Sequence, residues 1–215
     1  MNTLDEFPKV ALAEARARAE ALVAMMRPHC ERCEVAGSVR RGKAEVKDIE
    51  IVAVPKWEER VSGSDLFGAE RVKTNLLFEW AQGAQQSGLV EWIKPGTPAI
   101  VPWMIDPNGK YWRALARRPR EPLTSATMKL DLFLARPENF GLIFLIRTGP
   151  AEFSQKLVTQ KCKGGWMPDW MRVQDGRLWQ DKDPHKDGEP IFTPDEESVF
   201  KAIGMGFVEP GERKI

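Results

Sequence analysis

The pattern of apolar positions near the start of the chain predicts one long helix over residues 9–27. Apolar side chains recur there at helical spacing, and the charged side chains lie off that stripe. The stripe consists of Leu12, Ala19, Leu22, Val23 and Met26. Pro28 ends the helix, because proline disfavours helical geometry in the residue before it. Acids and bases are mixed on the polar face, which favours packing in a core over lying on a membrane surface.

Two later segments alternate between apolar and polar residues, as strands with one buried face do. The first covers residues 48–54, where acids alternate with isoleucines, and the second covers 128–134. In the second segment, leucines alternate with Lys129, Asp131 and Phe133. Each segment is therefore predicted to be a strand with one face in a core and the other face available.

Shorter patterns predict the remaining elements. These are strands over 34–36 and 110–116, and helices over 71–86, 151–162 and 194–203. The last helix has a clear start signal, with Thr193 expected as its N-cap, Pro194 in the first helical position and Glu196 three residues after the cap. Between the strand predicted over 128–134 and the helix predicted over 151–162, proline, asparagine and glycine mark a break near residue 140. We therefore expect an α+β protein in two parts, 1–140 and 141–215.

Composition excludes several classes of protein. The 215 residues are 42% hydrophobic and 29% charged, which is typical of a folded chain rather than a disordered one. Three cysteines exclude a disulfide-rich scaffold. No apolar run approaches the roughly 18 residues of a membrane helix, and the N-terminal segment lacks the pattern of a signal peptide. We expect an intracellular protein, cytoplasmic or nucleoid-associated and not secreted. With a net charge of +1, a nucleic acid would have to be bound by local basic patches.

Three acidic residues are the first candidates for chemistry. Strand periodicity places Asp48 and Glu50 on one face about 7 Å apart, where two carboxylates repel each other unless a cation lies between them. Asp131 is a lone acid among leucines on the other strand. If the two strands are neighbours, the three carboxylates converge, and hard oxygen ligands of this kind suit Mg²⁺. The alternative is that Asp48 and Glu50 simply face water on a half-exposed strand.

The segment just upstream, Gly37-Ser38-Val39-Arg40-Arg41-Gly42, changes the balance between these alternatives. Small residues let backbone N–H groups approach a phosphate, the Ser38 hydroxyl adds a donor, and arginine offers a planar fork for phosphate oxygens. A phosphate-binding turn followed by a strand with paired carboxylates supplies both parts of a nucleotidyl-transfer site.

Gly37-Ser38, Asp48-x-Glu50 and the distant Asp131 together resemble the nucleotidyltransferase superfamily, and within it the family X, polymerase beta-like DNA polymerases. The resemblance covers residues 15–55 and 125–215 and is poor across 57–125. The segments that carry it are 36–41 (AGSVRR), 132–141 (LFLARPENFG), 147–153, 188–190, 193–200 (TPDEESVF) and 207–213 (FVEPGER).

This resemblance implies a palm over residues 1–140, built from a mixed sheet with helices, and a small thumb over 141–215. It also implies metal-dependent, template-directed addition of deoxynucleotides to a primer 3′ end. Short-gap filling in DNA repair is the expected task, with two Mg²⁺ ions (Mn²⁺ as a substitute), deoxynucleoside triphosphates and primer–template or gapped DNA as partners of a monomer. Asp48, Glu50 and Asp131 match the metal-binding acids. The residues that match the nucleotide-binding positions are Gly37, Ser38, Arg40, Arg41, Thr148, Gly149 and Phe153.

The chain departs from the family pattern in four ways. Glu50 replaces the usual second aspartate, which bears on the spacing of the metal ions. Ile146-Arg147 stands where two aromatic residues are common, which bears on selection against ribonucleotides, and Ser154 replaces a common asparagine contact to the base. No helix-hairpin-helix segment precedes the catalytic part, so the lyase activity of some relatives is not expected.

Two groups of basic residues are candidates for binding a nucleic-acid backbone. The first is interleaved with Tyr111 and Trp112 and has a solvated charged loop as its alternative; it comprises Lys110, Arg113, Arg117, Arg118 and Arg120. The second comprises Lys156, Lys161, Lys163 and Arg172. Two other functions stay open at this point: nucleotidyl transfer without a template or to a non-DNA acceptor, and a catalytically inactive DNA-binding module.

Cysteines and tryptophans give weaker signals. Cys30-x-x-Cys33 would need two further zinc ligands, and Cys162 and His185 lie far away in sequence, so two ordinary thiols are favoured. For the tryptophans of the second half, packing is favoured over stacking on bases.

Overall fold

A five-stranded mixed sheet forms the centre of the first part of the chain. This computed structural model describes residues 7–65, 68–118, 126–181 and 188–215. The strands lie in the order β2-β4-β9-β8-β7. They are β2 (Cys30–Val35), β4 (Asp48–Pro55), β7 (Val90–Ile93), β8 (Tyr111–Ala116) and β9 (Met128–Leu134). In this sheet β4 and β9 are parallel and the other neighbours are antiparallel. The strands predicted over 48–54, 110–116 and 128–134 are thus confirmed.

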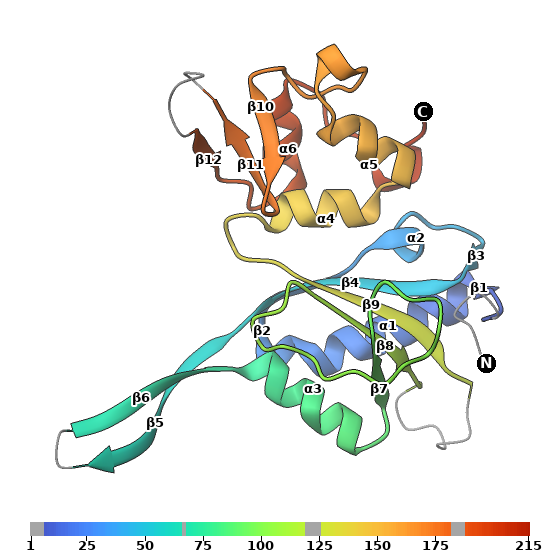
Figure 1. Ribbon diagram of the computed structural model, residues 1–215. Coiled ribbons are helices and arrows are strands. Elements are labelled where there is room, and N and C mark those ends of the chain that lie inside the picture. Colours follow the sequence, from blue (N-terminus) through green and yellow to red (C-terminus); the bar gives the residue numbers. More distant parts are fainter. Residues whose placement is uncertain (1–6, 66–67, 119–125, 182–187) are drawn as a thin grey trace.

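Two helices cover one face of this sheet (Figure 1). They are α1 (Leu12–Met26) and α3 (Leu76–Gln86). The apolar side of β4 and β9 packs beneath them, and the core it forms includes Ile49, Ile51, Leu130, Leu132, Leu22, Met26, Leu77 and Trp92. Four of the five stripe positions of the first predicted helix are buried, and Leu12 packs at the margin of the same core.

The second part of the chain has a core of its own. It contains α4 (Phe140–Thr148), α5 (Ala151–Val158) and α6 (Glu196–Ile203). A small antiparallel sheet of β10 (Met171–Gln174), β11 (Arg177–Gln180) and β12 (Glu189–Ile191) completes it. A third apolar cluster, which includes Val52, Phe133, Phe140 and Phe144, joins α4 to the uncovered face of the large sheet. The architecture is therefore α+β, with two cores that meet along α4.

Short elements complete the described chain. They are β1 (Val10–Ala11), β3 (Glu45–Val46), α2 (Gly37–Arg40) and the 3₁₀ turns Arg27–His29, Lys161–Lys163 and Pro210–Glu212. Among the described residues, no helix combines the length and apolar character needed to cross a bilayer.

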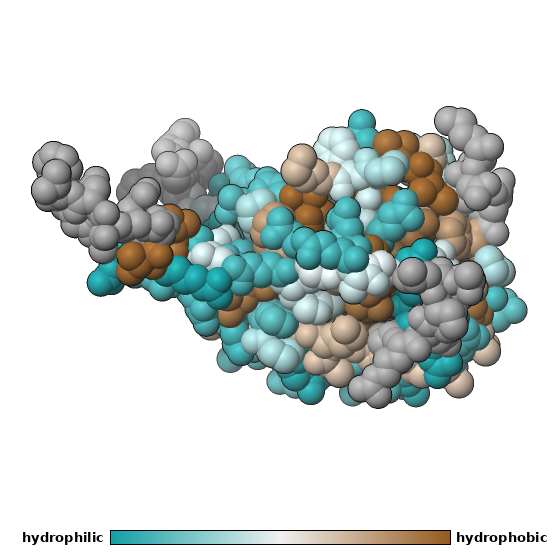
Figure 2. Space-filling model, turned by 90° about the horizontal axis from the view of Figure 1, so that it is seen from below, coloured by the Kyte–Doolittle hydropathy of each residue, from teal (hydrophilic) through white to brown (hydrophobic). Residues whose placement is uncertain are grey.

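The helix predicted over 71–86 is wrong at its start. Residues before Leu76 belong to β6 (Gly68–Asn75), which pairs with β5 (Trp57–Asp65) in a hairpin that projects from the body (Figures 1 and 2). The helix starts only at Leu76, because the Asn75 side chain accepts a hydrogen bond from the Phe78 N–H at 3.1 Å. Figure 2 also shows that apolar patches on this face are separated by hydrophilic side chains.

Three further boundaries differ from the sequence predictions. The N-cap of α6 is Asp195, which accepts a hydrogen bond from the Ser198 N–H at 2.8 Å, whereas Thr193 is buried and bonded through its backbone to Glu138. The helix predicted over 151–162 ends at Val158. Residues 140–148, where only a break is predicted, form α4, because its apolar side chains have the two cores to pack against.

Candidate active site

The three acidic residues lie on neighbouring strands. The parallel register of β4 and β9 pairs Glu50 with Asp131 and Asp48 with Lys129. Paired positions on adjacent strands are about 4.8 Å apart, and alternate residues share a face. These four side chains therefore share one face of the sheet, opposite the face covered by α1 and α3. The expectation that the two strands are neighbours is confirmed.

Cationic and hydroxyl groups already occupy oxygens of these acids. The Lys129 Nζ lies 2.7 Å from Asp48 Oδ2 and 3.5 Å from Asp131 Oδ2. The Arg113 Nε donates to Asp131 Oδ1 at 2.8 Å, and the Tyr111 hydroxyl donates to the same oxygen at 2.5 Å. Burial and the charge of Asp131 raise the pKa of Tyr111, so its hydroxyl remains a donor. Because one nitrogen contacts both aspartates, their Oδ2 atoms are no farther apart than the sum of those two distances.

Glu50 is the acid with the perturbed ionisation. Burial raises the pKa of Glu50 to about 7, and the charges of Asp48 and Asp131 push the pKa in the same direction. Arg41 and Arg147 oppose this rise. The rise in the pKa of Glu50 is the effect expected when two further carboxylates lie close to a buried one.

Gly37 lies directly against Glu50. A Cβ atom at Gly37 would be 1.9 Å from Glu50 Oε2, and the φ of Gly37 is +63°. Glycine adopts this left-handed backbone without the strain that other residues incur. The glycine therefore sets how closely the turn after β2 approaches the acidic residues.

Two buried donors beside Gly37 have no hydrogen-bond partner among the residues that the structure describes. They are the Ser38 Oγ and the Arg41 Nε. Burial lowers the pKa of Arg41, although the charges of Glu50 and Asp48 counteract this. Leaving a buried donor unpaired costs roughly 1–3 kcal/mol, so such atoms point to an acceptor that binds from outside the chain. The Arg41 Nη1 atom donates to the backbone oxygens of Thr148 and Gly149.

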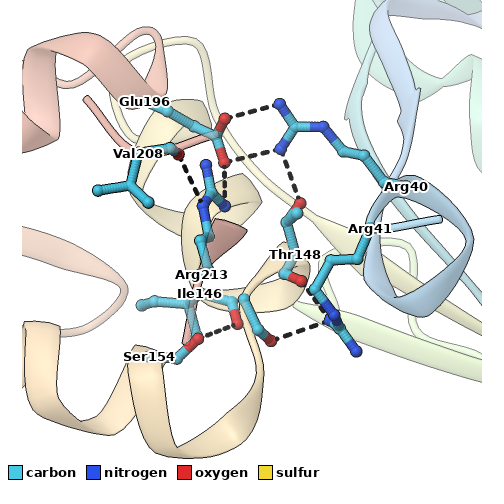
Figure 3. A network of polar contacts seen from close by, with 9 residues as sticks. Arg40, Arg41, Ile146, Thr148, Ser154, Glu196, Val208 and Arg213 are labelled. Carbon is cyan, nitrogen blue, oxygen red and sulfur yellow. Dashed lines mark hydrogen bonds and ion pairs between the residues drawn. The ribbon is translucent and has the colours of Figure 1, made fainter. Parts of the chain in front are cut away.

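A buried ion-pair network connects the same turn to the C-terminal part (Figure 3). Both terminal nitrogens of Arg40 donate to the Glu196 carboxylate at 2.7 Å, and Arg40 Nη1 also donates to Thr148 Oγ1 at 2.9 Å. Arg213 Nη1 reaches Glu196 Oε1 at 2.9 Å. Burial alone would raise the pKa of Glu196, but the hydrogen bonds from Arg40 and Arg213 outweigh it and lower the pKa.

Sequence reasoning gave Glu196 a place only in the helix start signal, where the structure has Asp195 and Ser198 instead, and gave Arg213 no role of its own. Both Glu196 and Arg213 are almost completely buried, at 5% and 2% exposure. Charged residues are seldom buried unless they are paired, but a sequence does not show which charges will be buried. The available signals were weak: an acid in the first turn of a predicted helix and an arginine in the segment 207–213.

Predicted nucleotide-binding residues from both parts of the chain lie close together. The structure brings Arg40 and Arg41 into contact with Thr148 and Gly149. Phe153 lies beside Gly149, since a Cβ atom at Gly149 would be 3.4 Å from the Phe153 ring. That ring is only 3% exposed and packs in the C-terminal core, 5.0 Å from the ring of Trp166.

The guanidinium of Arg147 packs at the end of a stack of aromatic rings, and Tyr111 at the other end bonds to Asp131. The guanidinium lies 4.0 Å from the centre of the Phe133 ring, which stacks at 4.8 Å on Tyr111. Arg147 and Phe133 also line a hollow of about 560 Å³ between the carboxyl ends of β4 and β9, helix α4 and the β10–β11 turn. The acidic face thus continues into an open space bordered by both parts of the chain.

The basic residues expected to contact DNA are scattered. Arg113 lies among the acidic residues, and a terminal nitrogen of Arg117 donates to the Gly88 backbone oxygen. Lys156 is half-buried on α5, while Lys161 and Lys163 are exposed on the 3₁₀ turn that follows. Arg120 and His185 lie outside the described residues.

The cysteine pair stays inside the fold. Cys30 and Cys33 are free thiols buried beneath α1. In the described part of the chain, no group of three or more His, Cys, Asp or Glu side chains is arranged to hold a metal ion as it stands. Among the three acids, the ammonium group of Lys129 contacts both Asp48 and Asp131.

Comparison with known proteins leaves the family of this chain open. No protein-family model matches it. A catalase-peroxidase of Pseudothermotoga lettingae is 26% identical over 145 residues, which is 64% of this chain and 18% of that protein. The chain spans less than a fifth of the relative that it matches, and the activity named for that protein is not transferred to this one.

Proposed function

We propose that this chain is a metal-dependent nucleotidyltransferase that adds deoxynucleotides to a DNA primer, as the family X polymerases do. One observation carries the proposal: the unpartnered buried donors of Ser38 and Arg41 belong to the turn whose Gly37 contacts Glu50, and Glu50 pairs with Asp131 across β4 and β9. Donors for phosphate oxygens beside ligands for divalent cations are what transfer from a nucleoside triphosphate requires.

The chemistry of the donor set supports divalent ions. Asp48, Glu50 and Asp131 offer hard carboxylate oxygens, and the ammonium group of Lys129 contacts two of these carboxylates. Two bound Mg²⁺ ions, or Mn²⁺ as a substitute, would stabilise charge on the attacking and leaving oxygens.

The side chains around the acids divide the remaining work. Ser38 Oγ and Arg41 Nε donate to oxygens of the triphosphate and retain the leaving pyrophosphate. Arg41 is held in place by the backbone of Thr148 and Gly149, so these two residues position the phosphate-binding guanidinium. Arg40 is occupied by Glu196 and serves the same turn as a structural anchor.

On this proposal, residues 1–140 act as a palm and 141–215 as a thumb. The exposed lysines at 161 and 163 lie on the thumb, where they can contact DNA phosphates. Short-gap filling in an intracellular repair process is the expected task.

Primer extension on gapped and blunt DNA tests the proposal. Asp131→Asn should reduce incorporation at least about a hundredfold, because it removes a charge that stabilises the transition state. Asp169→Asn is the matched control, since Asp169 is exposed and its carboxylate accepts local hydrogen bonds from Cys162. Incorporation that survives Asp131→Asn, in a protein with an unchanged circular dichroism spectrum, contradicts the mechanism.

A second candidate is transfer of a nucleotide to an acceptor other than templated DNA. The observation in its favour is that Arg113 pairs with Asp131 and Lys110 with Asp175, rather than both lying free on a DNA-facing segment. Efficient extension only without a template would favour this candidate. DNA binding without incorporation on any acceptor would indicate a catalytically inactive binding module.

A further inference from the structure

The ammonium group of Lys129 occupies a position that a divalent ion bound by two carboxylates would occupy. Its ammonium contacts one oxygen of Asp48 at 2.7 Å and one of Asp131 at 3.5 Å, and its side chain is only 16% exposed. Residues 129 and 131 of β9 share a face, and the register sets Lys129 beside Asp48 on β4. The strand that supplies one acid therefore also supplies the cation that neutralises it.

The charges around the acids amount to an excess of positive charge. Asp48, Glu50 and Asp131 bring three carboxyl groups. Four cationic side chains act on them: Lys129 on Asp48 and Asp131, Arg113 on Asp131, Arg41 on Glu50 and Asp48, and Arg147 on Glu50. These cations offset part of the attraction that the carboxylates exert on a divalent ion that enters alone. A triphosphate, which adds several negative charges, reverses that balance.

We propose that Lys129 is a built-in counter-cation that keeps a divalent ion off the three acids until a triphosphate arrives. The inference deepens the proposed function, on which it rests, because it concerns how the same acids acquire their ions. Lys129 holds Asp48 and Asp131 together in the nucleotide-free protein, and the ion displaces its ammonium when the added phosphate charge favours the exchange.

Binding of Mn²⁺ alone to the nucleotide-free full chain tests the inference. Electron paramagnetic resonance measures free Mn²⁺ in a titration of the wild type, Lys129→Met and Lys9→Met. Lys9→Met is the matched control, because Lys9 makes an exposed ion pair with Glu45. Lys129→Met should bind Mn²⁺ at least about tenfold more tightly than the wild type, a modest part of the Coulomb effect at this separation. Lys9→Met should leave the affinity unchanged.

A second measurement is the melting temperature, which reports how much Lys129 stabilises the folded protein. Without metal, Lys129→Met should melt at a lower temperature than the wild type, because Asp48 and Asp131 then repel each other. Added Mn²⁺ should restore the melting temperature of this variant more than it raises that of the wild type. Equal Mn²⁺ affinity in Lys129→Met and the wild type overturns the inference.

Should Lys129→Met fail to fold, two milder variants decide the matter. Lys129→Arg keeps the charge and should bind Mn²⁺ as weakly as the wild type, whereas Lys129→Gln should bind it more tightly. Equal affinity of these two variants overturns the inference. Primer extension tests the proposed function separately. A wild type that extends no primer contradicts that function, whereas the Mn²⁺ titration still decides whether Lys129 weakens ion binding.

Discussion

Glu50 is the residue whose protonation state most affects this site. In the folded protein the pKa of Glu50 is about 7, above the ordinary value of 4.5 that the unfolded chain approaches. Between these two pH values the folded state binds more protons than the unfolded state. The stabilising effect of the bound proton is thus complete below pH 4.5 and is lost as the pH rises through 7.

Urea unfolding in a chelator should show this dependence. Relative to Glu50→Gln, the wild type should lose up to about 3 kcal/mol of unfolding free energy between pH 4.5 and neutrality. The glutamine variant lacks the titrating group at position 50. That position should therefore add little to any change in its unfolding free energy over the same pH interval. A wild type that gains stability over that interval, relative to Glu50→Gln, contradicts the environment described for Glu50.

At this scale the sequence indicates which acids converge but not what neutralises them. Strand periodicity alone places Asp48 with Glu50, and Asp131 follows from a second alternating segment. Arg113 was expected to contact a nucleic-acid backbone, and Lys129 was given no role. Their positions depend on the register of β8 and β9 against β4, and that register comes from pairing across the sheet.

Among the elements, the turn from Gly37 to Gly42 controls the distance between phosphate donors and acids. Both glycines have a positive φ, of +63° and +71°. A Cβ at Gly37 would meet Glu50, whereas one at Gly42 would meet no atom within 4 Å. A side chain would strain the backbone at both positions, but only at Gly37 would it also collide with Glu50.

Gly37→Ala and Gly42→Ala should separate these two effects. Each should lower the unfolding free energy by about 1–2 kcal/mol through the left-handed backbone. Only Gly37→Ala should also reduce nucleotide incorporation, by about tenfold or more, because the Glu50 carboxylate must move to make room. Unfolding curves and primer extension measure the two effects, and equal activity of both variants would contradict the role of Gly37.

Element boundaries between residues 57 and 125 were the least predictable part of the fold. Residues 71–75 fit a helical pattern in isolation, but their backbone pairs with β5, and that partner strand carries no strong apolar alternation. Helix α4 escaped prediction for a related reason. Its near-continuous apolar sequence reflects burial between two cores rather than one helical stripe.

For the whole molecule, Glu196 joins the two parts of the chain through Arg40, and Arg213 of the C-terminal part also pairs with it. Since the pKa of Glu196 is lowered, the stabilising effect is present at neutral pH and is lost as the pH falls through that lowered pKa. Removing one member of a buried ion pair leaves the other charges uncompensated.

Glu196→Gln should therefore lower the unfolding free energy at pH 7 by about 3–5 kcal/mol. Glu197→Gln, in the same helical turn and exposed, is the control and should have a much smaller effect. In acid, where the wild-type carboxyl is itself protonated, the difference between the wild type and Glu196→Gln should shrink. A difference that stays constant with pH would show that packing, not charge, holds the two parts together.

On the proposed function, DNA binding would also be a property of the whole molecule. If the exposed lysines at 161 and 163 contact phosphates, affinity for primer–template DNA should fall steeply with salt concentration. Replacing both with alanine should reduce the slope of log affinity against log salt by roughly 2. Fluorescence anisotropy at several salt concentrations measures this slope, and an unchanged slope would place the DNA elsewhere.

Arg40 and Arg41 are adjacent in sequence, yet each reaches across to the C-terminal part, one to Glu196 and the other to the Thr148–Gly149 backbone. If the turn binds a phosphate as proposed, the arginines that support it depend on both halves of the chain. A polypeptide severed near residue 140 would carry all three acids on one fragment and the supports of Arg41 on the other. Reassembly of the two fragments would then be a precondition for holding the nucleotide.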